Sequence, residues 1–398
     1  MKPSIIHSIV VCLAAFTLPF MVACSSREES LPDNVTEAAL YLNIATIEQT
    51  RANTVELPDN EKMKSVRVVI LHAADGTVEH NRHFSLEGAQ AQKTILLKVR
   101  PNEKKKIFLF ANEESVSTIE GVTVESENQT LTAFFNCYTE GMSGFEAAVN
   151  NLYFAPDYSN GNPIPMSSIY KIDFPEKGNF DGTFYIVRIA TKFTCRFKNF
   201  RSDAVTVNSI SVSDIANDSY LMAHKQNPTM KFTEEDNSIS ELFWIDWLKK
   251  VSDESQEHPE DKTLADKRGW IMDYDIPESA VQVPTGQTNL KLSVPKANNT
   301  DVNQEQGTLY TFYLPESKDL IEPTETYGEQ RYKMTLGLTD EHDEQKSFNF
   351  AFDNLKALFR NTNAVIDIIM YDRKVVVDVI PYSSVSLDPI FGLDVKEQ

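Results

Sequence analysis

The chain of 398 residues has little glycine, little cysteine and little positive charge. Its 14 glycines argue against glycine-rich fibrous folds and against many nucleotide-binding loops. Lys and Arg total 38 against 58 Asp and Glu, which gives a net charge of -20. Because binding to nucleic acid or to anionic lipid depends on an excess of positive charge, this composition predicts neither partner.

Motifs of enzymatic chemistry are also missing. No segment matches a P-loop, GxGxxG, HExxH, EF-hand or CxxC pattern. The residues 141–144 contain two glycines but lack the second spacing of a nucleophile elbow. We therefore expect no enzyme, no cofactor, and no catalytic or metal-binding residues.

Two segments suggest metal binding, but each has a simpler interpretation. His80 and His83 lie three residues apart, so on a strand they would face opposite sides, and a polar loop is the simpler interpretation. The acidic segment from Asp340 to Glu344 offers hard oxygen ligands suited to Ca²⁺, and a solvated hairpin tip is the simpler interpretation.

The first segment reads as an export signal. Lys2 precedes an almost continuous apolar run from Ile5 to Ala23, the layout of a secretory leader. The sequence from Met21 to Ser26 resembles a bacterial lipobox, in which Cys24 is lipidated and becomes the new N-terminus. An ordinary signal peptide and an uncleaved membrane anchor are the alternatives.

Cysteine usage agrees with export. Cys12 is lost with the leader and Cys24 carries the lipid, so Cys137 and Cys195 remain. These two form either one disulfide or two buried apolar thiols, and the position of Cys195 on the apolar face of a predicted strand favours buried thiols.

The body of the chain has the two-residue period of β-strands. A strand is expected over residues 38–47, hairpins around Asp75 and Asp372, and a hairpin that brackets the acidic segment 340–344. One long strand is expected over 187–198, and a strand irregularity near Asn208. Strands about ten residues apart are typical of β-sandwiches, so the expected fold is mainly all-β.

Helices are expected to be few. Residues 144–152 predict two turns, and residues 240–251 predict an amphipathic helix within a charged insertion at 233–270. Residues 163–182 read as a connector, and the domain boundary is expected at 175–185. Trp244, Trp247 and Trp270 predict either a sugar-binding platform or core packing of the insertion.

The C-terminal tail has an unbroken alternation of apolar and other residues after Pro381. Such an amphipathic strand packs either on its own domain or into another subunit, as in donor-strand complementation. The apolar positions of this predicted donor strand are Val385, Leu387, Pro389, Phe391, Leu393 and Val395.

A predicted cleavage site follows the first strand. Arg51 lies in a polar stretch, and an exposed bond between Arg51 and Ala52 suits a trypsin-like protease. Cutting there would release the lipidated end together with the first strand, and the first domain would be left with an apolar groove. The alternative is an uncut loop residue.

These features together resemble the fimbrillin-type (type V) pilins of Bacteroidales and their lipoprotein precursors. The resemblance is carried by six short segments in the same order. They are Cys24 with its lipobox and residues 40–52, 108–113, 164–167, 187–192 and 387–393. The acidic insertion at 233–270 has no counterpart in it.

The resemblance implies two transthyretin-like Greek-key β-sandwich domains, with a short helical insertion in the second. It divides the chain into a signal peptide (1–23), a propeptide with lipidated Cys24 and the first strand (24–51), an N-terminal sandwich (52–182), a C-terminal sandwich (183–382) and a donor-strand tail (383–398). It also implies cleavage after Arg51 and polymerisation by strand exchange.

The expected function is therefore that of a structural pilin at the outer membrane and cell surface. Its expected partners are other pilin subunits, the outer membrane through the lipid before cleavage, and, for a tip subunit, a host or bacterial surface ligand. A surface-anchored glycan-binding lipoprotein is the alternative. The resemblance does not decide between a stalk, a tip and an anchor subunit.

Overall fold

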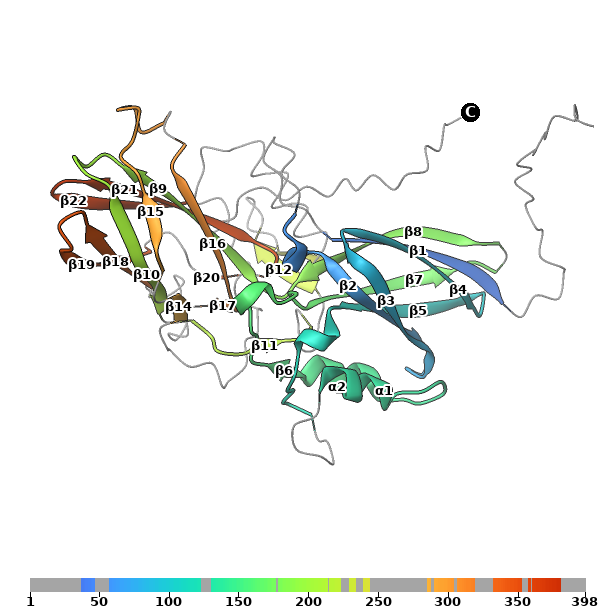
Figure 1. Cartoon of the computed structure of the whole chain (residues 1–398). Coiled ribbons are helices and arrows are strands. Elements are labelled where there is room, and N and C mark those ends of the chain that lie inside the picture. Colours follow the sequence, from blue (N-terminus) through green and yellow to red (C-terminus); the bar gives the residue numbers. More distant parts are fainter. Residues whose placement is uncertain are drawn as a thin grey trace, which may run out of the picture. The chain divides into compact units, whose positions relative to one another are not determined.

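The computed structural model describes residues 37–46, 57–122, 130–176, 178–213, 215–222, 229–233, 239–243, 285–287, 290–303, 306–318, 332–352, 357–358 and 360–380 (Figure 1). This part of the chain is mainly β, arranged as two β-sandwich domains with short helices in the N-terminal one. The predicted fold class is thereby confirmed.

Seven strands form the first sheet, in the order β3-β2-β5-β7-β8-β1-β4. Their bounds are β1 Ala38–Thr46, β2 Met63–His72, β3 Val78–Gln90, β4 Gln92–Val99, β5 Glu103–Ala111, β7 Met166–Phe174 and β8 Phe180–Arg188. The sheet folds back on itself, because β7 and β8 pair over only two residues, Met166 with Arg188 and Ser167 with Val187. Apolar residues from both halves, including Leu40, Val68 and Leu109, share one buried core.

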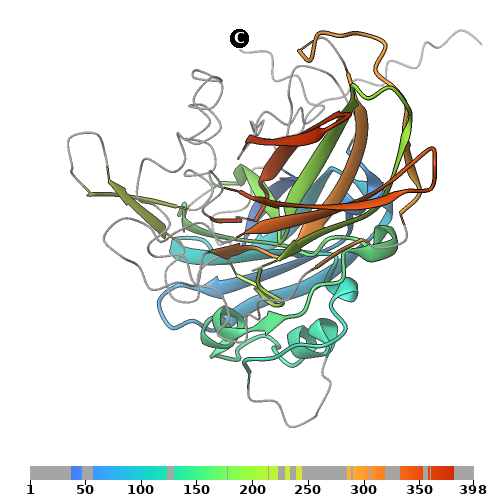
Figure 2. The ribbon, with the colours of Figure 1, turned by 90° about the vertical axis from the view of Figure 1, so that its left-hand side faces the viewer.

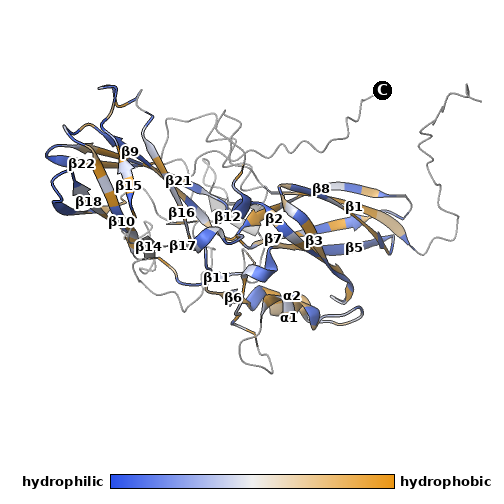
Figure 3. Cartoon of the chain, viewed as in Figure 1, coloured by the Kyte–Doolittle hydropathy of each residue, from blue (hydrophilic) through white to orange (hydrophobic). Residues whose placement is uncertain are grey.

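The central strands of this sheet are buried on both faces. Val68 and Ile70 of β2 face the sandwich core, whereas Val69 and Leu71 face a second core under two helices. Those helices are α1 Leu131–Asn136 and α2 Phe145–Asn151 (Figure 2). Figure 3 shows hydrophobic and hydrophilic residues alternating along the strands, the period that the sequence predicted.

Only one of these two helices was predicted. Residues 144–152 form α2 as expected. The helix α1 was not anticipated. Its N-cap is Thr130, whose hydroxyl oxygen accepts a hydrogen bond from the Ala133 amide at 3.1 Å.

Two sheets form the C-terminal sandwich. One has the order β14-β10-β18-β19, with β15 also paired to β10, and the other has the order β16-β9-β21-β22. Their bounds are β9 Thr191–Asn199, β10 Val205–Ser213, β14 Thr285–Gln287, β15 Leu292–Val294, β16 Thr308–Leu314, β18 Lys333–Asp340, β19 Gln345–Ala351, β21 Asn363–Tyr371 and β22 Lys374–Ile380. The predicted irregularity near Asn208 is confirmed as a register shift between Val207 and Ser209.

Short elements complete the described chain. Three two-stranded pairs are β6 with β11, β12 with β13, and β17 with β20. The bounds are β6 Tyr153–Phe154, β11 Ser219–Tyr220, β12 Thr229–Thr233, β13 Ile239–Phe243, β17 Ser317–Lys318 and β20 Ala357–Leu358, with 3₁₀ turns η1 Asp59–Glu61, η2 Glu113–Ser115 and η3 Ser159–Gly161.

The single long strand predicted over 187–198 is wrong. The chain forms two strands, β8 and β9, separated at Ile189 and Ala190. β8 pairs with β1 in the first sandwich and β9 pairs with β16 and β21 in the second. The two residues between them bond to other segments, since the Ile189 amide donates to the Pro165 carbonyl at 2.8 Å and the Asn361 amide to the Ala190 carbonyl at 2.8 Å.

Three further expectations need correction. Residues 163–182 are not a connector, because they contain β7 and the start of β8. The predicted helix 240–251 begins as strand β13, paired with β12, and its remainder lies outside the described residues. His80 and His83 lie on strand β3 rather than in a loop, because that segment pairs with β2.

The two cysteines behave differently. Cys195 is buried on the inner face of β9, as predicted, and burial raises the pKa of its thiol. Cys137 is exposed beyond the end of α1, so the expectation of a buried thiol is wrong there. The two thiols are not bonded to each other.

Candidate functional site

The first strand, β1, lies inside its sheet rather than at an edge. It pairs in parallel with β8 from Leu40 to Thr46 and antiparallel with β4 from Ala38 to Ala45 (Figure 1). Both rows of its backbone hydrogen-bonding groups are therefore engaged. Its removal would expose the edges of two strands at once.

One face of β1 is fully buried. Leu40, Leu42 and Ile44 each have 0% exposure and belong to the core of the first sandwich. Burying one such side chain stabilises the folded domain by roughly 1.5–3 kcal/mol, so the three together contribute on the order of 5–9 kcal/mol. That is comparable with the whole stability of an ordinary domain, about 5–15 kcal/mol. The N-terminal sandwich therefore needs some strand in this position.

The wall beside Leu42 is formed by a glycine between two aromatic rings. Leu42 pairs with Gly182 of β8, and the flanking residues on the same face are Phe180 and Phe184. A Cβ atom on Gly182 would lie 2.7 Å from the Phe180 ring and 2.9 Å from the Phe184 ring. Only glycine fits there without moving these rings, whose centroids are 6.4 Å apart.

The outer face of β1 makes polar contacts with both neighbours. The Asn43 amide donates to the Asp181 carboxylate of β8 at 2.6 Å and accepts from the Thr94 hydroxyl of β4 at 2.9 Å. At the start of the strand, the Lys98 ammonium of β4 lies 3.7 Å from the Glu37 carboxylate. These groups are solvent-accessible, so they contribute more to the choice of partner than to stability.

The chain that follows β1 is anchored independently at η1. The Glu61 carboxylate, fully buried, accepts from the Lys192 ammonium at 2.6 Å and the Tyr313 hydroxyl at 2.6 Å, and it also forms an ion pair with Arg188. The Ile164 amide donates to the Asn60 carbonyl at 2.9 Å. Residues from 57 onward therefore have their own attachments, separate from those of β1.

A second buried charge joins segments that are distant in sequence. The Arg360 guanidinium, with 0% exposure, donates to the Glu316 carboxylate at 2.8 Å, to the Leu221 carbonyl at 3.0 Å and to the Ser167 hydroxyl at 3.2 Å. It thereby ties the segment after β11 to β7 of the first sheet.

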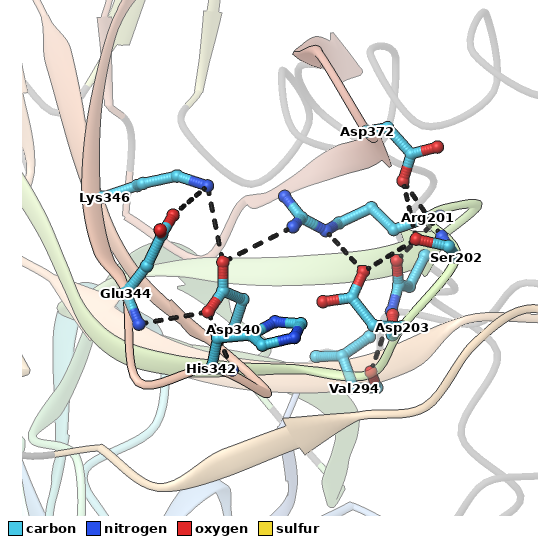
Figure 4. A network of polar contacts seen from close by, with 10 residues as sticks. Arg201, Ser202, Asp203, Val294, Asp340, His342, Glu344, Lys346 and Asp372 are labelled. Carbon is cyan, nitrogen blue, oxygen red and sulfur yellow. Dashed lines mark hydrogen bonds and ion pairs between the residues drawn. The ribbon is translucent and has the colours of Figure 1, made fainter.

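The acidic segment 340–344 forms the tight turn of the β18–β19 hairpin, as predicted (Figure 4). One Asp340 oxygen accepts the backbone amides of His342 and Glu344, both at 3.0 Å. The other lies 3.4 Å from the Lys346 ammonium and 3.8 Å from Arg201. Although Asp203, Asp340 and His342 come close enough to share an ion, two cations already balance the carboxylates, which disfavours Ca²⁺.

The histidines of β3 have separate partners. The ring nitrogen Nε2 of His80 lies 2.6 Å from the Lys98 carbonyl oxygen, and that of His83 lies 2.8 Å from the Glu114 carboxylate. Sequence reasoning missed another cluster of possible ligands, His72, Glu79 and Glu103. The Lys105 ammonium lies 2.6 Å and 2.5 Å from its two carboxylates, so a lysine takes the place that a cation would occupy.

The other predicted site residues lie outside the described residues. They are the lipidation site Cys24, the cleavage site Arg51 and Ala52, the tail positions Val385, Leu387, Pro389, Phe391, Leu393 and Val395, and the tryptophans Trp244, Trp247 and Trp270. Within the described residues, no helix is both long and apolar enough to cross a membrane.

No family model and no curated protein matches the sequence. Among solved structures, the chain is similar to a candidate cell adhesion protein from Parabacteroides distasonis, with 12% identity, a TM-score of 0.46, and coverage of 88% of this chain and 99% of the other. It is also similar to the tip fimbrial protein Mfa3 from Porphyromonas gingivalis, with 10% identity, a TM-score of 0.46, and coverage of 87% and 99%. A fimbrial assembly protein from Parabacteroides distasonis has 11% identity, a TM-score of 0.42, and coverage of 89% and 100%.

Proposed function

We propose that the protein is a structural subunit of a cell-surface fimbria. In this proposal it is exported as a lipoprotein through Cys24, matured by cleavage after Arg51, and polymerised when the tail of one copy replaces β1 of the next. The sequence resemblance suggests this assembly. The position of β1 is the structural observation that supports it.

The argument rests on what β1 contributes and on how it is connected. It supplies a fully buried row of side chains and pairs with two strands, so it fills a place that the sandwich needs. It is also the first strand of the described residues, and the residues after position 57 have their own contacts. A single cut between 46 and 57 would therefore separate β1 covalently without removing any other strand that the structure describes.

The predicted cleavage point falls in that interval. Arg51 and Ala52 lie between the end of β1 at Thr46 and the anchored carboxylate of Glu61. Cutting there would leave β1 attached to the lipidated Cys24 and held only by non-covalent contacts. Its departure would open an apolar groove between β4 and β8.

The tail offers a strand of matching length and pattern. β1 spans nine residues and places an apolar side chain inward at every second position. The tail has six alternating apolar residues between 385 and 395, and three of them, Leu387, Phe391 and Leu393, are large. An inserted tail would restore backbone hydrogen bonds to both neighbours, except for the one that Pro389 cannot donate, and would re-cover the core.

The first experiment is N-terminal sequencing of the protein in material sheared from the surface of the native cell. A start at Ala52 supports cleavage and assembly. A blocked start at Cys24, retained with the membrane, would point to an anchor subunit or to the glycan-binding alternative. The variant Arg51→Ala should abolish shortening, and normal shortening of that variant would refute the proposed site.

A second experiment separates assembly from folding. Deleting residues 383–398 should abolish polymers and leave a folded monomer, because these residues follow the last described strand, β22. Circular dichroism checks that the deleted protein is folded. Full polymerisation without the tail would refute its role as donor.

A further inference from the structure

We propose that the inserted tail has one preferred register, in which Phe391 of one copy takes the place of Leu42 in the next copy. This inference rests on the proposed function, since it requires that the tail replace β1. The tail is taken to run in the direction of β1, parallel to β8 and antiparallel to β4, because this direction restores both existing ladders.

Charges on the outer rim of the groove are unevenly placed. Asp181 of β8 pairs with Tyr41 and bonds to Asn43, so the middle of the groove carries a negative charge on the β8 side. Lys98 of β4 pairs with Ala39, so the beginning of the groove carries a positive charge. Both side chains are exposed and would be present when a new strand arrives.

The tail also carries its charges unevenly. The residues between its apolar positions are Ser386, Asp388, Ile390, Gly392 and Asp394. These would face outward, toward the same rim. A carboxylate at the position of Tyr41 or Asn43 would lie beside Asp181, and like charges across neighbouring strands are destabilising.

The repulsion between carboxylates beside Asp181 excludes most registers of the tail. Four alternatives share the fault that Asp388 or Asp394 falls beside Asp181. They are the registers that place Leu387, Pro389, Leu393 or Val395 at the Leu42 position. Placing Val385 there avoids the repulsion, but residues after Pro389 would then lie beyond the nine positions of β1 and cover none of the core.

The remaining register avoids the repulsion at Asp181 and also covers the core of the groove. With Phe391 at the Leu42 position, residues 387–395 cover positions 38–46. Asp388 then lies opposite Lys98, and Ile390 lies opposite Leu96, a leucine that is 54% exposed. Ile390 and Gly392 take the two positions beside Asp181, those of Tyr41 and Asn43, and bring no charge there.

The core side of the groove also suits this register. The Phe391 ring would enter the site walled by Gly182 and the rings of Phe180 and Phe184, where aromatic side chains can stack or meet edge to face. The register has two costs. Pro389, at the position of Leu40 between β4 and β8, has no backbone N–H to donate, and Asp394 would fall at the position of Ala45, which is fully buried. Because a buried unpaired carboxylate is costly, we expect the inserted strand to leave the groove after Leu393.

Disulfide trapping tests the register directly. The variant pair Leu96→Cys with Ile390→Cys, in a Cys137→Ser background, should give disulfide-linked dimers of the chain in sheared fimbriae on non-reducing gels. Directly opposite residues have Cα atoms about 4.5–5.5 Å apart, within disulfide reach, whereas residues two positions away lie about 7–8 Å apart. Leu96→Cys paired with Asp388→Cys or Gly392→Cys are matched controls and should give little product.

Each outcome has a distinct meaning. Polymers that cross-link through position 388 or 392 instead of 390 would overturn the register and leave strand exchange intact. Polymers that cross-link at none of the three positions would overturn the register, and if cysteines at Ser384, Ser386 and Asp394 also fail to cross-link to Leu96→Cys, the proposed donor is overturned as well. Failure to find any polymer of the unaltered chain would count against the proposed function itself.

A charge test addresses the cause of the register. Gly392→Asp should slow assembly roughly two- to five-fold, the ratio expected for like charges on neighbouring strands, because it places a carboxylate beside Asp181. Gly392→Asn adds similar bulk without charge and should assemble faster than Gly392→Asp. Adding Asp181→Asn to Gly392→Asp should restore the rate. Equal rates for the Asp and Asn variants, or no rescue, would refute selection by charge.

Discussion

Replacing Leu42 by alanine should destabilise the uncut chain and leave the shortened chain unaffected. Leu42 is fully buried within β1, between β8 and β4. Truncating a buried leucine to alanine costs about 2–5 kcal/mol, through lost burial and the cavity that remains. With a urea dependence of about 1–3 kcal/mol per molar, the unfolding midpoint of the uncut N-terminal sandwich should fall by roughly 1–2 M.

The matched control is Leu97→Ala in β4. Leu97 lines the same core at 3% exposure but belongs to a strand that stays with the shortened chain. The assay is urea unfolding of the uncut, unlipidated protein (Cys24→Ala) and of shortened protein recovered from fimbriae. Leu97→Ala should weaken both forms, and Leu42→Ala only the uncut form. If the uncut Leu42→Ala protein is as stable as the uncut parent, the buried position of β1 in the first sandwich is refuted. If Leu42→Ala lowers the stability of both the uncut and the shortened protein, the release of β1 on cleavage is refuted.

Three further predictions follow from other parts of the structure. Iodoacetamide should label Cys137 in the native protein and Cys195 only after unfolding, because burial raises the pKa of the Cys195 thiol; rapid native labelling of both would contradict the buried inner face of β9. Arg360→Met should cost about 3–5 kcal/mol by leaving Glu316 buried without its cation, and the double variant with Glu316→Leu should recover part of that loss in urea unfolding; a single variant that costs nothing would refute the buried pair. In the β2–β3 turn, hydrogen bonds from the Thr77 hydroxyl and amide hold the pKa of Asp75 below its usual value, so the stability that Asp75→Asn removes should be present near neutral pH and vanish as the pH falls through the native pKa; a difference independent of pH would contradict this assignment.

The local patterns predicted the strands well, because they depend on neighbouring residues. The alternation of apolar residues located β1, and turn residues located the hairpins β2–β3, β18–β19 and β21–β22. The helix α1 had a readable signal that was overlooked. Leu131, Phe134 and Phe135 have the spacing of one helical face, directly after the capping residue Thr130.

The break between β8 and β9 had no such signal. Ile186, Val187 and Ile189 are all buried, but each faces a different core. A two-residue period records only that side chains are buried, so it cannot reveal that the chain passes from one sandwich to the other. The carboxylate of Glu61 was missed for a similar reason, because its three partners come from residues 188, 192 and 313.

The order of the strands along the chain is compatible with a β1 that occupies the groove between β4 and β8 only until cleavage. β1 is made first, but its parallel partner β8 comes about 140 residues later, and parallel pairing over such a separation closes slowly. The hairpin β2–β3, by contrast, pairs through a short turn and needs no distant segment. The two walls of the groove, β4 and β8, pair with β1 and not with each other, so the strand between them completes this part of the sheet. In the proposed assembly a strand of another chain with the same apolar period would meet the same groove, and we expect the groove to select its occupant by pattern, by the rings beside Gly182 and by the charges of Asp181 and Lys98.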